Sequence, residues 1–265
     1  MNAVILIPAR YASSRYPGKP LVPLKGASGT AKPLIERSVE AARRVAGVSG
    51  VFVTTDDERI AEACRGSRVG VIMTSPECRN GTERCAEAAR QLHDVDLVIN
   101  FQGDALLTPS SFVEALIGRM AEDSDALVAT PALRLRSDEV RGLQAEEAAG
   151  RVGGTSVVTD AKGRALYFSK RLIPHLPANA LEGAMSPARL HVGVYAYRPQ
   201  SLELYAATPP SELEQLEGLE QLRFLDAGVP VAVVDVETPP FAMRELNNPE
   251  DVAPIEQALA AAGIE

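Results

Sequence analysis

Short, almost uninterrupted apolar runs alternate with helix-like stretches through the first half of the chain. The apolar runs cover residues 3–7, 51–54, 69–73, 96–101 and 126–130. Strands that are apolar at nearly every position are buried on both faces, as in a parallel sheet. Helical spacing of apolar residues fills the intervals, over residues 32–45, 57–65, 81–92 and 109–120. This order predicts right-handed βαβ units and a three-layer α/β/α sandwich around a mostly parallel mixed sheet.

The pattern changes after residue 150. The stretch "TSVVTDAKGRALYFSK" predicts two strands joined around Lys162 and Gly163, and "LHVGVYAYRP" predicts one more strand. Helical spacing returns over residues 212–227 and 249–262, with the strand "VPVAVVDV" between them, while "LKGASGTAKP" is typical of a surface loop. We therefore expect one domain over residues 1–265, with a smaller antiparallel β-rich insertion at about 150–200.

Composition narrows the class of protein. The 265 residues are 46% hydrophobic, and no apolar run approaches the roughly 18 residues of a membrane span. The first residues lack a basic leader, so we expect a soluble, cytoplasmic protein. Three cysteines without a Cys-x-x-Cys pair argue against a disulfide framework and a thiolate zinc site. A net charge of −8 would repel a polyanion, which argues against nucleic acid as a partner.

Against this acidic background, a basic loop follows the first predicted strand. The stretch "IPARYASSRYPGKPL" carries Arg10, Arg15 and Lys19. It is no Walker A loop, because Pro20 follows Lys19 where Ser or Thr is required, and the chain has no dinucleotide-binding Gly-x-Gly-x-x-Gly. Guanidinium forks and backbone amides could still wrap a triphosphate. The alternative is a solvated basic loop without function.

Two further stretches follow predicted strands at the same edge of the sheet, where ligands of open α/β sheets bind. Asp104 ends "FQGD", and a divalent cation could bridge its carboxylate to phosphate oxygens. An ordinary turn or N-cap aspartate is the alternative. Gly81 and Thr82 open the helix of "RNGTER", with Arg84 one turn further, where free amides could approach a base or a phosphate. Ordinary helix capping would use the same residues.

A third group could hold a sugar acid. His191 and Tyr195 lie four residues apart on a presumed strand, hence on one face, and Glu220, Gln221 and Arg223 lie on a presumed helix. Together they offer donors for a carboxylate and acceptors for hydroxyls. A lone histidine on a strand is more often a core residue with its hydrogen bonds satisfied.

Taken in order, these motifs resemble a known family over nearly the entire chain. They are "IPARYASSRYPGKPL", "TTDDERIAEA", "GTERCAEA", "INFQGD", "GRALYFSKRLIP", "HVGVYAYR", "LEQLRFLDAG" and "NNPEDV". The chain resembles the 3-deoxy-D-manno-octulosonate cytidylyltransferases, or CMP-Kdo synthetases. The resemblance implies a nucleotide-diphospho-sugar transferase-like fold and a Mg²⁺-dependent homodimer. It also implies transfer of CMP from CTP to a 2-keto-3-deoxy sugar acid with release of pyrophosphate, for lipopolysaccharide or sugar-acid biosynthesis.

The resemblance also implies roles for individual residues. The triphosphate would be held and activated by Arg10, Arg15, Lys19 and Asp104. The nucleotide would be contacted by Ala9, Ser14, Asn80, Gly81, Thr82 and Gln102. The acceptor would be held by Arg84, Gln102, His191, Tyr195, Glu220 and Gln221. The metal would be bound by Asp104 and Asn247.

Departures from the family pattern keep other hypotheses open. Ala105 follows Asp104 where the family has Glu, and Asn247 replaces the second metal-binding aspartate. We expect either weaker metal binding or compensation by Glu245. Ser156 and Leu190 replace a lysine and an arginine. The nucleotide half is thus kept better than the acceptor half. Besides a Kdo-like ulosonic acid, the acceptor could be another small acid such as a phosphonate, or the chain could bind nucleotide without turnover.

Overall fold

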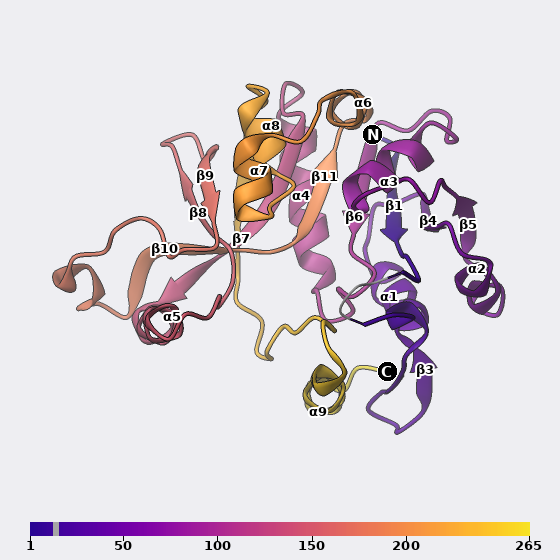
Figure 1. Ribbon diagram of the computed structural model, residues 1–265, viewed down its shortest axis with the longest axis horizontal. Coiled ribbons are helices and arrows are strands. Elements are labelled where there is room, and N and C mark those ends of the chain that lie inside the picture. Colours follow the sequence, from indigo (N-terminus) through magenta and orange to yellow (C-terminus); the bar gives the residue numbers. More distant parts are fainter. Residues whose placement is uncertain (13–15) are drawn as a thin grey trace.

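A central sheet with helices on both faces organises the chain (Figure 1). The computed structural model describes residues 1–12 and 16–265. The parallel half of the sheet contains β1 (Ala3–Pro8), β4 (Gly50–Thr55), β5 (Gly70–Met73) and β6 (Leu97–Phe101). Its strands run in the order β5-β4-β1-β6, and every neighbouring pair is parallel. The three-layer α/β/α fold is therefore confirmed.

The second half of the sheet is antiparallel and continues from β6 without a break. Its strands are β7 (Val128–Arg136), β8 (Ser156–Thr159), β9 (Ala165–Ser169), β10 (Met185–His191) and β11 (Val194–Tyr197). They extend the order as β6-β11-β7-β10-β8-β9, while β12 (Val231–Val236) returns parallel to β7. The predicted β-rich region thus widens the main sheet.

Alternate residues of β1 show why the helices form two layers. Ala3, Ile5 and Ile7 pack into one cluster with α1 (Leu34–Ala42), α2 (Glu58–Arg65) and α4 (Ser110–Glu122). Val4 and Leu6 pack on the opposite face against α3 (Gly81–Ala89), α6 (Pro199–Ala207) and α8 (Leu222–Asp226). Because strand side chains alternate between faces, an all-apolar strand requires cover on both. Another helix, α5 (Ser137–Ala148), follows β7; neither α5 nor α6 was predicted.

Two predicted elements are interrupted. The helix expected over 212–227 is two short helices, α7 (Glu212–Glu217) and α8, because Gly218 takes a left-handed conformation (φ 61°) that ends α7. Glu220 and Gln221 therefore lie in the turn between the helices. The strand expected in "LHVGVYAYRP" breaks at Val192 and Gly193 into β10 and β11.

The predicted surface loop "LKGASGTAKP" is largely a hairpin of β2 (Pro23–Lys25) and β3 (Ala31–Pro33). The C-terminal helix α9 (Val252–Ala262) packs beside it (Figure 1). Ala27 N–H donates to the Ile264 carbonyl at 2.9 Å, which ties the hairpin to the chain end. This tertiary contact explains why a loop-like composition forms strands. None of the helices in the described part of the chain is both long and apolar enough to cross a membrane.

Candidate active site

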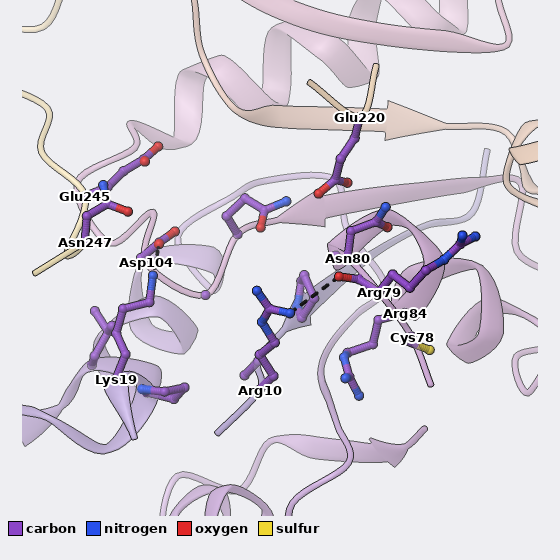
Figure 2. A pocket seen from close by; sticks show the side chains of 17 residues that line it. Arg10, Lys19, Cys78, Arg79, Asn80, Arg84, Asp104, Glu220, Glu245 and Asn247 are labelled. Atoms are coloured by element: carbon purple, nitrogen blue, oxygen red, sulfur yellow. Dashed lines mark hydrogen bonds and ion pairs between the residues drawn. The ribbon is translucent and has the colours of Figure 1, made fainter. Parts of the chain in front are cut away.

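A cavity of about 420 Å³ opens at the carboxyl ends of β1 and β6 (Figure 2). It gathers residues from all three stretches that follow predicted strands, together with two later segments of the chain. Its polar lining residues include Arg10, Lys19, Arg79, Asn80, Arg84, Gln102, Asp104, Glu220, Glu245 and Asn247. The strand ends therefore meet at one site, as the sheet topology requires.

An ion pair joins the basic loop to the Gln-Gly-Asp turn. The Lys19 ammonium lies 2.5 Å from Asp104 Oδ2, and both side chains are mostly buried, at 21% and 16% exposure. Lys19 opens a short 3-10 helix after Gly18, whose positive φ of 73° is accessible to glycine at little cost. Glu245 and Asn247 line the same cavity, and Figure 2 draws them on the same side of it as Asp104. The fold thus concentrates opposite charges at one end of the cavity.

The turn that carries Asp104 is held from several sides. Gly103 packs so tightly that an added Cβ would lie 2.8 Å from the Pro8 carbonyl oxygen. The Ser38 hydroxyl donates to the Gly103 carbonyl at 2.7 Å. Leu106 is buried in a cluster that includes residues of α9. Leu106, part of the departure from the family pattern, therefore anchors this turn on the C-terminal helix.

Residues 78–81 form the opposite wall of the cavity. Asn80 caps α3, because its Oδ1 accepts the Glu83 N–H at 2.8 Å while its Nδ2 donates to the Tyr205 hydroxyl at 2.9 Å. Gly81 lies so close to Gln102 that a Cβ would come within 3.2 Å of that amide. Arg10 reaches across the cavity and donates to the Arg79 carbonyl at 3.4 Å (Figure 2).

Behind this wall lies a buried guanidinium. Arg223, at 1% exposure, donates to both carboxylate oxygens of Glu214 at 2.7 and 2.6 Å and stacks on the Tyr205 ring at 3.9 Å. It also donates to Glu83 at 3.3 Å, and Glu83 in turn accepts the Arg79 backbone N–H at 2.9 Å. Burial alone would raise the pKa of Glu83, but hydrogen bonds from Arg79 and Arg223 lower it overall. Helices α7 and α8 thus support the wall.

Two other residues of this region are fixed by internal contacts. Arg84 is 3% exposed and pairs with Asp56 at 3.1 Å while donating to the Thr74 hydroxyl. The backbone N–H of Thr82 donates to Glu220 at 3.3 Å. Burial raises the pKa of Glu220, although the bond from Thr82 favours its ionised form.

A second cavity, of about 270 Å³, adjoins the first and shares Glu245 and Asn247 with it. His191 lines this second cavity, and its ring centroid lies 5.3 Å from that of Tyr195. The two side chains meet, although they belong to different strands. His191 Nε2 lies 2.9 Å from the Thr130 hydroxyl, and burial lowers the pKa of His191 to about 3. The imidazole is therefore neutral at neutral pH.

The structure sorts the predicted site residues into three groups. The first cavity is lined by Ala9, Arg10, Lys19, Asn80, Gly81, Arg84, Gln102, Asp104, Glu220 and Asn247. His191 lines the second cavity, whereas Thr82, Tyr195 and Gln221 are buried and do not belong to the lining of either one. Ser14 and Arg15 lie outside the described residues.

Several lining residues were missed from the sequence. Cys78 and Arg79 line the first cavity, and Met243 and Arg244 line the second. Arg79 directly precedes the predicted Asn80, and Arg244 directly precedes Glu245, so position next to a predicted residue was the only available signal. Burial and a hydrogen bond to Glu87 raise the pKa of Cys78 to about 12, so its thiol stays protonated at neutral pH.

Comparison with known proteins gives consistent matches along the chain. The family described as cytidylyltransferase matches residues 4–234. The 3-deoxy-manno-octulosonate cytidylyltransferase of Maricaulis maris is 39% identical over 99% of both chains. The 8-amino-3,8-dideoxy-manno-octulosonate cytidylyltransferase of Shewanella baltica is 38% identical, over 98% of this chain and 99% of its own.

A solved structure agrees with the sequence relatives. It is that of CMP:2-keto-3-deoxy-manno-octonic acid synthetase complexed with CTP, which is 35% identical to this chain. The TM-score is 0.84, over 99% of this chain and 100% of the other. The likeness therefore extends over the two cavities and both halves of the sheet.

Proposed function

Because the chain belongs to the cytidylyltransferase family, we propose that it transfers CMP from CTP to a 3-deoxy-2-ulosonic acid, releasing pyrophosphate. The observation that carries the proposal is the meeting of Lys19, Arg10 and Asp104 in one cavity. Nucleotidyl transfer needs cations that bind the triphosphate and a carboxylate that binds the metal ion accompanying it. Arg15 is proposed for the same task from the sequence alone.

In the proposed reaction these residues position the substrates and supply positive charge. A hydroxyl oxygen of the acceptor attacks the α-phosphorus of CTP in line and loses its proton to solvent, and the bond from that phosphorus to the pyrophosphate oxygen breaks. Lys19 and Arg10 neutralise the negative charge that grows on the leaving pyrophosphate. Asn80 and Gly81 lie in the wall that would contact the nucleoside. A side chain at position 81 would press against Gln102, whereas glycine lets the nucleoside approach the backbone closely.

We propose Mg²⁺ as the cofactor, with Asp104 as its carboxylate ligand and Asn247 or Glu245 nearby. No group of three or more His, Cys, Asp or Glu residues that could hold a metal occurs within residues 1–12 and 16–265. This fits Mg²⁺, which is usually bound by one or two carboxylates plus substrate phosphates. When bound, the ion would neutralise phosphate charge, and the Asn247 amide would offer one neutral oxygen.

The acceptor is proposed from the relatives, whose names specify eight-carbon ulosonic acids. In this proposal Gln102, His191, Glu220 and Arg84 contact the acceptor, while Tyr195 and Gln221 support it from behind. A neutral His191 suits hydroxyl recognition. We also propose that the chain acts as a single-domain cytoplasmic homodimer and that residues 150–200 contribute to dimerisation. Light scattering on the purified protein tests the dimer.

An acceptor panel tests the activity. The enzyme is incubated with CTP and Mg²⁺ and with 3-deoxy-manno-octulosonate, its 8-amino analogue or a small phosphonate, and pyrophosphate release is measured. We expect turnover with an ulosonic acid and its loss when EDTA removes the metal. Turnover with the phosphonate alone would replace the proposed acceptor. CTP binding without turnover on any acid would contradict the enzymatic proposal and favour a nucleotide-binding protein.

A further inference from the structure

The two cavities are joined by one segment of irregular backbone. Residues 237–248 form neither helix nor strand, and they supply Glu245 and Asn247 to both cavities and Met243 and Arg244 to the second. An acceptor seated beside Glu245 and Asn247 would therefore border both cavities. The second cavity is thus available to the acceptor, if the proposed function holds.

The lining of the second cavity mixes apolar and polar groups and carries few charges. Its larger apolar side chains are those of Leu107, Leu190, Val192 and Met243, beside Ala105. Among its described lining residues Arg244 carries the sole positive charge, because His191 is neutral.

The hydrogen bonds of Thr130 explain the state of His191. The Thr130 hydroxyl has a single proton and lies 2.9 Å from the Val194 carbonyl, which can only accept. Thr130 therefore accepts from His191 Nε2–H, and the second ring nitrogen, Nδ1, remains a hydrogen-bond acceptor. Such an imidazole suits an acceptor hydroxyl and gives no charge to a carboxylate.

Electrostatics makes a cation necessary for an acidic acceptor. Asp104, Glu220 and Glu245 place three acidic side chains on the walls of the two cavities. The Lys19 and Arg10 cations would be engaged by the triphosphate. The other two guanidinium groups of the first cavity are already paired, Arg79 with Glu83 at 2.6 Å and Arg84 with Asp56 at 3.1 Å. A carboxylate that enters beside these acidic groups without a cationic partner would be repelled and incompletely desolvated.

Arg244 can meet this need. Its side chain is exposed at the cavity, and none of the described residues forms a hydrogen bond or ion pair with its guanidinium. A guanidinium presents a rigid fork that matches a carboxylate with two parallel hydrogen bonds. We propose that Arg244 binds the carboxylate of the acceptor acid and thereby determines the enzyme's selectivity for acids. This inference rests on the proposed cytidylyltransferase activity.

The test combines enzyme and substrate changes. Pyrophosphate release is measured for wild type, Arg244→Gln and Arg244→Lys, with 3-deoxy-manno-octulosonate and with its C1 methyl ester, in which the carboxylate charge is removed. Arg65→Gln removes an equally positive side chain from the end of α2, away from both cavities, and serves as the matched control. Thermal unfolding checks that the exposed substitutions leave the fold intact.

We expect Arg244→Gln to lower kcat/KM for the acid about tenfold to a hundredfold, the effect of losing a charged hydrogen-bonding partner. The KM for CTP should stay within about twofold, and Arg244→Lys should recover part of the loss because it keeps the charge without the fork. Wild type should lose a similar factor on the ester, whereas Arg244→Gln should treat acid and ester alike.

Two results would overturn the inference alone. One is that wild type is active on the acid and that Arg244→Gln has the same kcat/KM as wild type and as the Arg65→Gln control. The other is an equal loss on acid and ester in Arg244→Gln, because the side chain would then act on something other than the carboxylate. If wild type releases no pyrophosphate with any ulosonic acid, the proposed function fails, and this inference fails with it.

Discussion

The first cavity, where we propose that the triphosphate binds (the phosphate end), and the second cavity, where we propose that the acceptor binds (the acceptor end), are built in different ways. At the phosphate end, short tight turns follow buried parallel strands, and charged groups are already paired, as Lys19 is with Asp104. At the acceptor end, the walls come from a broken antiparallel strand and the irregular segment 237–248, with a neutral His191 and a guanidinium on Arg244. Preassembled charge serves the shared chemistry of the triphosphate, whereas the irregular segment 237–248 can change its side chains without disturbing the sheet, so acceptor selectivity can change there.

The largest effect on stability should come from Arg223, which lies buried behind residues 78–81, the wall of the first cavity. Arg223→Met should lower the free energy of unfolding by about 3–5 kcal/mol, because Glu214 would be left buried without its charged partner and Glu83 would keep only Arg79. Urea denaturation measures this, with the exposed Arg65→Met as a control expected to change it by less than about 0.5 kcal/mol. An unchanged urea midpoint would mean that the contacts of Arg223 contribute little to stability.

The next effect concerns catalysis at the phosphate end. Lys19→Ala should reduce pyrophosphate release a hundredfold or more, about 2.7–4 kcal/mol of transition-state stabilisation by analogy with the loss of one oxyanion donor. Circular dichroism should show an intact fold, and Lys162→Ala at an exposed hairpin turn should retain normal turnover. Full activity of Lys19→Ala would remove Lys19 from the mechanism.

The acceptor end should show its own pH dependence of stability. His191 has its pKa lowered by burial to about 3, against an ordinary value of 6.5. Between these values the unfolded chain binds a proton that the folded chain does not, so stability should fall as pH drops from about 6.5 toward about 3. Above this window His191 costs nothing. Melting temperatures across the range should fall less steeply in His191→Gln, and parallel curves for both proteins would contradict the assignment.

The smallest effect should come from Tyr205→Phe, which tests whether the wall of residues 78–81 affects the binding of CTP without affecting the chemical step. Tyr205→Phe removes the hydroxyl that accepts from Asn80 Nδ2, a loss of about 1 kcal/mol for a neutral hydrogen bond. The KM for CTP should rise by about fivefold while kcat stays nearly constant, because the wall shifts and the phosphate groups do not. Steady-state kinetics with varied CTP decides this, and a fall in kcat at unchanged KM would place the effect at the reacting atoms instead.

The sequence alone predicted most of the parallel half of the fold and of the phosphate end. Uninterrupted apolar strands such as residues 3–7 can only be buried on both faces, and parallel strand ends must meet at one edge. Arg10, Lys19, Gln102 and Asp104 could therefore be brought together without coordinates. The broken helix at Gly218 and the broken strand at Val192 were not predicted, because local spacing continues through both interruptions.

Only the tertiary structure decided the surroundings of these groups. From the sequence, Arg223 was a candidate donor for a sugar acid, but its burial against Glu214 and Glu83 depends on the packing of α8 against α7 and α3. Arg244 gave no signal beyond its position next to Glu245, because the cavity it lines is closed by segments distant in sequence. The physical reason is general: apolar periodicity and strand ends are local properties written in consecutive residues, whereas a partner, a buried charge or a cavity exists only once distant segments have packed together.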